Sequence, residues 1–233
     1  MLVLAIDTAL EACAAAVLDT GSAKLIAQAS QTMKRGHAEA LMPLIARVMK
    51  EAGVPFAALD RIAVTTGPGS FTGLRVGLAA ARGISLAAER PVVGVTTLSA
   101  YAAPAFSENG EDPIICAIDA RHDQVYFQVV GGNGSPLIEP KLATVAEALE
   151  ASRFGAPHLL GDAAKTLAAR WPADAPPPIR VAAQAAPDIG WVARLGAASN
   201  PATAPARPCY LRPADARSPG KQPHRPAQSA AKQ

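Results

Sequence analysis

The first half of the chain switches between two spacings of apolar residues. Short apolar runs bounded by turn residues predict three adjacent strands, at residues 2–6, 13–18 and 25–29. From His37 the apolar positions recur every three or four residues until Gly53, which predicts an amphipathic helix. Pro43 lies inside this pattern, so either the helix begins late enough to place Pro43 in its first turn or it kinks there.

A glycine-rich turn then separates a strand from a long helix. Residues 61–66 form an apolar run, Gly67-Pro68-Gly69 provides the turn, and Ser70 is a suitable N-cap for a helix that extends to about Glu89. Another strand and another helix follow, at residues 91–95 and 96–106. Together these elements predict an α/β lobe of about 105 residues, a size typical of a small domain.

The pattern then restarts. Residues 114–119 repeat an apolar run that ends in aspartate, and residues 124–130 alternate as the next strand before a glycine-rich turn. Three helices are predicted at 144–153, 162–171 and 187–197, and two short strands at 158–160 and 179–181. This order predicts a duplicated ribonuclease-H-like lobe, as in the actin, Hsp70 and sugar-kinase superfamily, with a shortened second copy. The predicted boundaries are 1–105 for the first lobe, 106–212 for the second and 213–233 for a tail.

Charge is distributed unevenly along the chain, whose formal net charge is +3. Residues 201–233 carry six basic side chains against one acidic side chain, so the body before them is slightly acidic. No basic face for nucleic acid follows from this composition, and the basic, Pro- and Ala-rich tail is expected to be disordered. With no leader pattern and no apolar stretch of membrane-spanning length, we expect a cytoplasmic protein with no membrane contact.

The segment from Thr66 to Gly77 has the most specific sequence, Thr-Gly-Pro-Gly-Ser-Phe-Thr-Gly-Leu-Arg-Val-Gly. A glycine-rich turn before a helix presents backbone N–H groups that suit a phosphate. The candidate residues for such a site are Asp7, Thr8, Gly67, Gly69 and Ser70. The alternative interpretation is a structural role, in which the small residues Gly73, Gly77 and Ala81 let another helix approach closely.

This segment resembles the signature of the TsaB family, also called YeaZ, within the wider TsaD/Kae glycoprotease-like group. Other stretches that resemble the family are Ala5-Ile6-Asp7-Thr8-Ala9, His37-Ala38-Glu39, residues 60–64, 94–98 and 118–121, and Pro208-Cys209-Tyr210-Leu211-Arg212. The resemblance spans residues 1–212 and is strongest before residue 130.

The resemblance implies a subunit without catalytic residues of its own. It would pair with the catalytic relative TsaD in making threonylcarbamoyladenosine beside the anticodon of transfer RNA, together with a TsaE-like ATPase. ATP and metal are expected on those partners, contact with transfer RNA only through the complex, and a homodimer when the chain is alone. The implied partner interface lies on the two long helices, at His37, Leu41, Leu44, Ile45, Val48, Gly73, Val76, Gly77, Ala80, Ala81 and Ile84.

Two enzymatic interpretations compete with this one. TsaD carries a metal-binding His-x-x-x-His on the corresponding helix, but the fourth residue after His37 is Leu41, so no helical metal pair is expected here. Asp7 and Asp119 end the first strand of each predicted lobe, where enzymes of the superfamily keep an acidic residue near metal and phosphates. An independent ATP- or sugar-phosphate-binding enzyme therefore remains the alternative.

Overall fold

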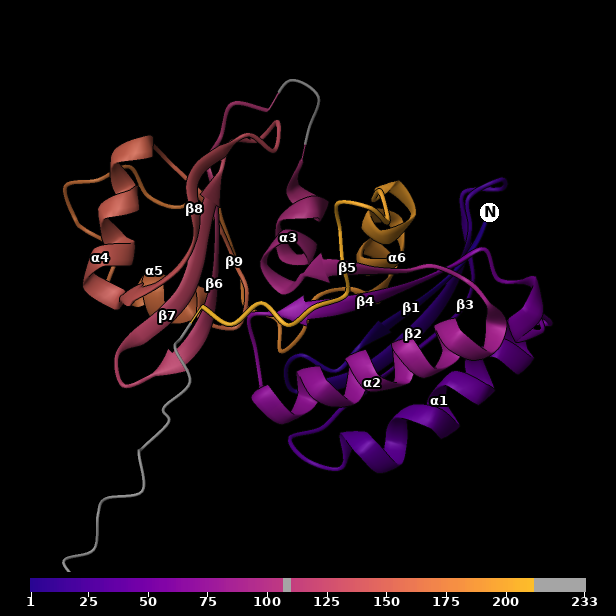
Figure 1. Ribbon diagram of the computed structural model, residues 1–233. Coiled ribbons are helices and arrows are strands. Elements are labelled where there is room, and N and C mark those ends of the chain that lie inside the picture. Colours follow the sequence, from indigo (N-terminus) through magenta and orange to yellow (C-terminus); the bar gives the residue numbers. More distant parts are fainter. Residues whose placement is uncertain (107–109, 212–233) are drawn as a thin grey trace, which may run out of the picture.

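The computed structural model describes residues 1–106 and 110–211, and within them the chain forms two lobes, each built on a five-stranded sheet (Figure 1). The first sheet has the order β3-β2-β1-β4-β5. Its strands are β1 (Leu2–Asp7), β2 (Ala12–Asp19), β3 (Lys24–Thr32), β4 (Arg61–Gly67) and β5 (Val92–Thr96). The second has the order β10-β9-β6-β7-β8. Its strands are β6 (Ile114–Arg121), β7 (Gln124–Val130), β8 (Pro136–Thr144), β9 (His158–Leu160) and β10 (Arg180–Ala182).

The two sheets have the same topology. In each, the first strand pairs antiparallel with the second and parallel with the fourth, and the outer pairs continue this pattern. Read from the third strand, both sheets have the order third, second, first, fourth, fifth. This repetition confirms the predicted two-lobed ribonuclease-H-like fold.

Strand β8 was absent from the sequence prediction. It contains Pro136 and Pro140, and proline usually argues against a strand because it lacks a backbone N–H. In the structure β8 is the edge strand of the second sheet and pairs only with β7 among the described strands. An edge strand has one unpaired side, which is where proline is tolerated.

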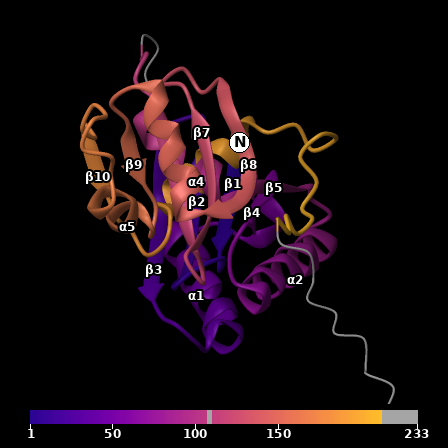
Figure 2. The same ribbon diagram turned by 90° about the vertical axis from the view of Figure 1, so that its left-hand side faces the viewer.

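Helices cover both sheets (Figures 1 and 2). On one face of the first sheet lie α1 (His37–Ala52) and α2 (Phe71–Ala88), and on the other lies α6 (Ile189–Ala198). Between the two sheets lies α3 (Thr97–Ala102), and on the outer face of the second lie α4 (Val145–Leu149) and α5 (Ala164–Ala169). Short 3-10 helices are η1 (Phe56–Ala58), η2 (Ala103–Ala105) and η3 (Glu150–Phe154).

The second lobe is the shorter one, as predicted. Its strands β9 and β10 have three residues each, and its helices α4 and α5 have five and six. In the first lobe α1 has 16 residues and α2 has 18. The first lobe therefore carries the two long helices, and Figure 1 shows them side by side on its outer face.

The predicted boundary between the lobes is wrong for the C-terminal part of the second range, 106–212. Helix α6 packs on the first sheet, where Ile189, Val192 and Ala193 join a buried cluster with side chains of β1, β2, β4 and β5. The Arg61 side chain donates hydrogen bonds to the carbonyls at the end of α6. The periodicity of α6 shows that it needs an apolar partner surface, but not which sheet supplies it.

Helix α1 excludes the first of the two alternatives for Pro43, a late start of the helix. The helix begins at His37, so Pro43 lies in its second turn rather than its first. Proline has no backbone N–H, so Pro43 cannot donate to the carbonyl of Glu39 one turn earlier. Both residues are exposed. The helix ends at Gly53 as predicted, and Gly53 adopts the left-handed conformation, at φ 65°, that glycine accepts without strain.

The segment after α6 returns across both lobes. We call residues 204–211 the C-terminal strap; in Figure 1 it runs as the yellow segment from α6 past β5 and β4 to the second lobe. The Gly94 N–H donates to the Ala204 carbonyl at 2.9 Å, and the Cys209 N–H donates to the Thr66 carbonyl at 2.7 Å. The predicted tail, 213–233, lies outside the described residues. None of the helices in residues 1–106 and 110–211 has the length and apolar character needed to span a bilayer.

Candidate functional site between the lobes

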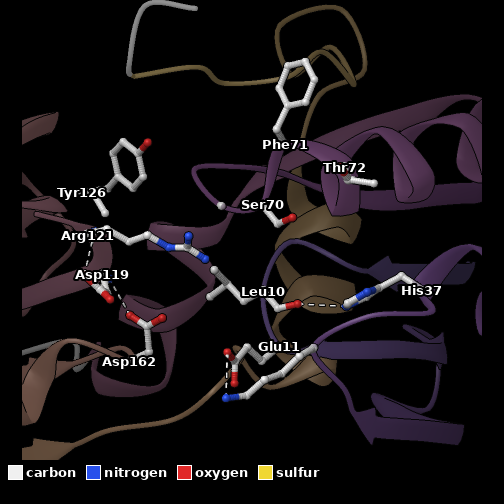
Figure 3. Close-up of a pocket in the computed structure, with 13 residues that line it drawn as sticks. Leu10, Glu11, His37, Ser70, Phe71, Thr72, Asp119, Arg121, Tyr126 and Asp162 are labelled. Carbon is white, nitrogen blue, oxygen red and sulfur yellow. Dashed lines mark hydrogen bonds and ion pairs between the residues drawn. The ribbon is translucent and has the colours of Figure 1, made fainter. Parts of the chain in front are cut away.

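A cleft of about 530 Å³ separates the lobes (Figure 3). One wall belongs to the first lobe: the loop after β1, the start of α1 and the N-terminus of α2. The other belongs to the second lobe: the end of β6, Tyr126 of β7 and the turn after β9. Its lining residues are Leu10, Glu11, Lys34, His37, Gly69, Ser70, Phe71, Thr72, Asp119, Ala120, Arg121, Tyr126 and Asp162.

The N-terminus of α2 is tied to the loop after β1. The Ser70 side chain accepts a hydrogen bond from the Gly73 N–H at 3.3 Å, which confirms Ser70 as the N-cap. The Ser70 N–H donates to the Ala9 carbonyl at 2.7 Å. One backbone donor of the predicted phosphate site is therefore already bonded within the chain.

The glycines of the signature segment serve this same contact. A Cβ atom built on Gly69 would lie 2.3 Å from the Ala9 carbonyl oxygen, and one built on Gly73 would lie 2.1 Å from that of Thr8. At Gly77 it would lie 2.5 Å from the Thr8 hydroxyl, which itself donates to the Gly73 carbonyl at 2.7 Å. The predicted role in close packing is confirmed, but the element that approaches is the loop after β1 and not another helix.

Asp7 lies behind the cleft and not in its lining. The side chain is fully buried; it accepts hydrogen bonds from the Thr65 hydroxyl at 2.6 Å and the Ala9 N–H at 2.9 Å. Burial raises the pKa of this carboxyl, because desolvation penalises the charged form, and these hydrogen bonds oppose the shift. Asp7 therefore fixes the end of β1 and its loop.

The residues predicted to bind phosphate lie in two environments, the lining of the cleft and the interior of the first lobe. Gly69 and Ser70 line the cleft, whereas Asp7, Thr8 and Gly67 are buried and lie outside its lining. Gly67 has φ +102°, and a Cβ there would meet the Leu74 side chain at 2.9 Å and the Cys209 carbonyl at 3.2 Å. The structure thus does not bring the five residues together around one open space.

The second wall carries Asp119, which the sequence pattern singled out at the end of its strand, and Asp162, which it did not. The Asp119 N–H donates to Asp162 Oδ1 at 2.8 Å, and Asp119 Oδ1 accepts from the Arg121 N–H at 2.8 Å. Desolvation, with a contribution from the nearby Asp119 carboxylate, raises the pKa of Asp162 to about 6. Asp162 follows Gly161 after β9, as Pro68 follows Gly67 after β4, so the internal repeat marks the position of this turn but not its aspartate.

His37 lies on the first wall of the cleft, and its imidazole forms a hydrogen bond within the chain. Its Nε2 lies 3.0 Å from the Leu10 carbonyl oxygen, to which the protonated nitrogen donates (Figure 3). Among residues 1–106 and 110–211, no group of three or more His, Cys, Asp or Glu side chains is placed to hold a metal ion. In this conformation His37 therefore fixes the loop after β1 against α1.

Most of the side chains predicted to meet a partner are buried in the chain's own core. The buried ones are Leu41, Leu44, Ile45, Val48, Gly73, Gly77, Ala81 and Ile84. Their apolar stripes face the first sheet, as the amphipathic pattern requires, so most of them are not available to a partner, and Ile84, at 8% exposure, lies at the margin of the buried set. His37, Val76 and Ala80 are half-buried. Any partner surface on α1 and α2 must use the exposed neighbours of the buried set.

Such neighbours form an apolar groove of about 640 Å³ on the outer side of the two long helices. We call it the helix groove; it is lined by Met42, Phe56, Ala57, Ala80, Gly83, Ile84, Ala87, Ala88 and Glu89. Met42 is 48% exposed and Phe56 is 36% exposed. No heavy atom lies within 4 Å of a Cβ built on Gly83, so this glycine faces open space, unlike Gly73.

The repeated sheets and the cleft between them define a two-lobed α/β protein of the actin-like class. The family model described as TsaD, tRNA N6-adenosine threonylcarbamoyltransferase, matches residues 24–184. The chain belongs to this family, and within it to the TsaB (YeaZ) group.

Three relatives illustrate the similarity. The tRNA threonylcarbamoyladenosine biosynthesis protein TsaB of Escherichia coli K12 is 37% identical over 127 residues, covering 54% of each chain. TsaB of Haemophilus influenzae is 38% identical over 127 residues, covering 54% of this chain and 52% of its own. The solved structure of YeaZ from Pseudomonas aeruginosa has a TM-score of 0.72 at 28% identity, covering 90% of this chain and 99% of that one. The chain spans about half the length of the curated relatives it matches.

Proposed function

We propose that this chain is an accessory subunit in the synthesis of threonylcarbamoyladenosine in transfer RNA, and that it acts by pairing with its catalytic relative, a tRNA N6-adenosine threonylcarbamoyltransferase. The names of its TsaB relatives support the pathway. The match to the TsaD family model supports a partner of related fold, because that match includes both long helices. Two chains of similar fold can pair through equivalent surfaces, as in a two-fold symmetric dimer.

The helix groove is the observation that carries the pairing. Exposed apolar surface that is contiguous and lined by small residues is typical of a protein interface. Ala80, Gly83 and Ala87 lie one helical turn apart along α2, so a partner helix can approach its backbone closely. Met42 and Phe56 supply the larger apolar contacts around that seam.

The first lobe's own contacts support an accessory role. Asp7 stands where enzymes of this superfamily keep an acidic residue, yet here it is fully buried and accepts hydrogen bonds from Thr65 and Ala9. The Ser70 N–H, at the turn that would hold a phosphate, donates to Ala9. Asp7 Oδ1 and the Ser70 N–H are therefore occupied in holding the first lobe together. Catalytic residues, ATP and metal are accordingly assigned to the partners, including a TsaE-like ATPase.

The substitution Gly83→Arg tests the pairing. An arginine at this position projects from the open face of α2 into the groove, without a clash within the chain. We expect at least tenfold weaker binding to the catalytic relative, because a desolvated, unpaired charge at an interface costs more than about 1.4 kcal/mol. Size-exclusion chromatography with light scattering on each protein and on their mixture measures the loss, and cells depleted of the native chain report modification.

Ala146→Arg is the matched control, because Ala146 is an exposed alanine on α4 of the other lobe. It should pair as the unsubstituted chain does. Pairing by Gly83→Arg at full strength would remove the helix groove from the interface, and a mixture that never forms a complex would reject the accessory role itself. The unsubstituted chain alone also reports whether a homodimer forms, and Gly83→Arg alone reports whether that dimer uses the same groove.

One observation favours an alternative, an enzyme that binds ATP or a sugar phosphate. Gly69, Ser70, Lys34 and Arg121 line one open cleft with Asp119, so cationic groups and a helix N-terminus face the same space. Nucleotide turnover by the purified chain that is lost in Asp119→Ala would support this alternative. Turnover at the background rate, with pairing intact, would support the accessory role.

A further inference from the structure

Two exposed aromatic rings and an arginine stack together at the edge of the cleft. The rings of Phe71 and Tyr210 have centroids 5.6 Å apart at an interplanar angle of 32°, and the Arg75 guanidinium lies 3.8 Å from the centroid of Phe71. Phe71 is 52% exposed and Tyr210 is 49% exposed. We call Phe71, Arg75 and Tyr210 the aromatic platform. Large aromatic side chains held at the surface in this way have stacking area to offer a ligand.

Holding the C-terminal strap in place does not account for the platform. The strap is attached by backbone hydrogen bonds from Gly94 to Ala204 and from Cys209 to Thr66, and by the Arg82 side chain, which donates to the Ala206 carbonyl at 2.6 Å. Leu211, next to Tyr210, packs against the buried cluster between the lobes. The strap is therefore anchored on both sides of Tyr210, and half of that side chain remains open to solvent.

Cationic side chains accompany the aromatic platform. Arg75 is exposed beside Phe71, and Lys34 and Arg121 line the cleft that Phe71 also lines. The cleft also carries Asp119 and Asp162, so its charge is mixed, whereas Arg75 lies outside that lining. A nucleotide at the platform can therefore stack its base on the rings while its phosphate contacts Arg75.

We propose that the aromatic platform stacks an unpaired base of single-stranded RNA, so that this chain contacts RNA directly. The choice of RNA as the polymer rests on the proposed function, whereas the stacking rests on the geometry of the three side chains. Bases splayed from loops stack on aromatic rings and on arginine planes, and both are present here. Tyr126 and Arg121 stand on the opposite wall of the cleft from Phe71, so an adjacent base has a second aromatic ring within the same opening (Figure 3).

Fluorescence anisotropy with a short labelled single-stranded RNA of mixed sequence tests the platform on the full chain. Phe71→Leu and Tyr210→Leu keep an apolar side chain but remove the ring, and each should weaken binding about tenfold, because base stacking on an aromatic ring contributes roughly 1–3 kcal/mol. Phe106→Leu is the matched control: Phe106 is also exposed, at 40%, and lies outside the platform. A fully paired RNA should bind more weakly than the single strand.

The outcomes separate the platform from the proposed function. Loss of RNA binding in both platform variants, with Phe106→Leu unchanged and thermal midpoints alike, supports the platform. RNA binding that is absent, or equal in all variants, overturns it, and so does a loss of pairing with the catalytic relative in Phe71→Leu while RNA binding persists, because that outcome identifies a protein contact. If the chain binds RNA through the platform but never pairs with the catalytic relative, the platform stands and the accessory role fails.

Discussion

The two lobes share one strand order but place their polar groups differently. In the first lobe, the strand β1 ends at Asp7, which is buried, and the turn at Gly67 is filled by Leu74 and the C-terminal strap. In the second lobe the equivalent strand reaches Asp119, which is exposed, and the turn at Gly161 leads to Asp162 in the cleft. The two glycines have nearly the same φ, 102° and 103°.

The two lobes share one strand order but have different structural roles. The first lobe uses its turns for internal packing and presents two long helices outward, with the helix groove between them. The second lobe has short helices and presents carboxylates and Arg121 to the cleft. The same strand order can therefore support a surface for a partner in one lobe and a polar wall in the other.

The largest effect is expected from alanine substitutions at two glycines of α2. In Gly73→Ala the new Cβ would lie 2.1 Å from the backbone oxygen of Thr8, which cannot move without shifting the loop after β1. We expect a loss of roughly 2–3 kcal/mol or more in the free energy of unfolding, from overpacking. In Gly83→Ala the Cβ meets nothing within 4 Å, and the better helix propensity of alanine should add about 1 kcal/mol.

Urea unfolding of the two variants and the unsubstituted chain measures this contrast. The same chemical change on the same helix should give opposite signs, because one position faces the chain and the other faces open space. If both variants were destabilised alike, the helix groove would have to be closed in solution. If neither were, the packing assigned to the signature glycines would be wrong.

The repeat made the fold predictable, and long-range packing limited the prediction. Alternation and helical spacing are local, so they located the strands of the first lobe and the restart at residue 114. They could not reveal that α6 returns to the first sheet, or that β8 is an edge strand able to hold Pro136 and Pro140.

The site was predicted less well for the same reason. The signature segment was correctly identified as a turn with a capped helix, but its buried face and its exposed face cannot be told apart by spacing alone. Leu44 and Val48 therefore appeared as interface residues although they belong to the core. Asp162 depended on the pairing of β9 with β6, which sequence separation conceals.

A smaller effect is expected from removing the equivalent carboxylates. Asp7→Ala leaves the Thr65 hydroxyl and the Ala9 N–H buried without their acceptor, which should lower the free energy of unfolding by about 2 kcal/mol. Removal of a carboxyl that is costly to desolvate offsets part of this loss. Asp119→Ala removes an exposed side chain and should change stability by less than about 0.5 kcal/mol. Denaturant midpoints measured side by side check the contrast, and equal losses would contradict the different burial of the two carboxylates.

The smallest expected effect is a pH dependence of the free energy of unfolding, which tests how far the Asp162 carboxyl on the second wall of the cleft is shielded from solvent. Because the pKa of folded Asp162 is raised from 3.8 to about 6, protonation favours the folded state, and the stability from this group is present below pH 4 and lost as pH rises through 6. Asp162→Asn cannot titrate, and its amide oxygen can still accept from the Asp119 N–H. Its stability relative to the unsubstituted chain should therefore increase by roughly 1–2 kcal/mol between pH 4 and pH 7, a range reduced for partial exposure.

Asp174→Asn, at an exposed aspartate of the same lobe, controls for net charge. A pH-independent difference for Asp162→Asn in urea unfolding would show that this carboxyl is well solvated, and the contrast between the two lobes would then rest on Asp7 alone.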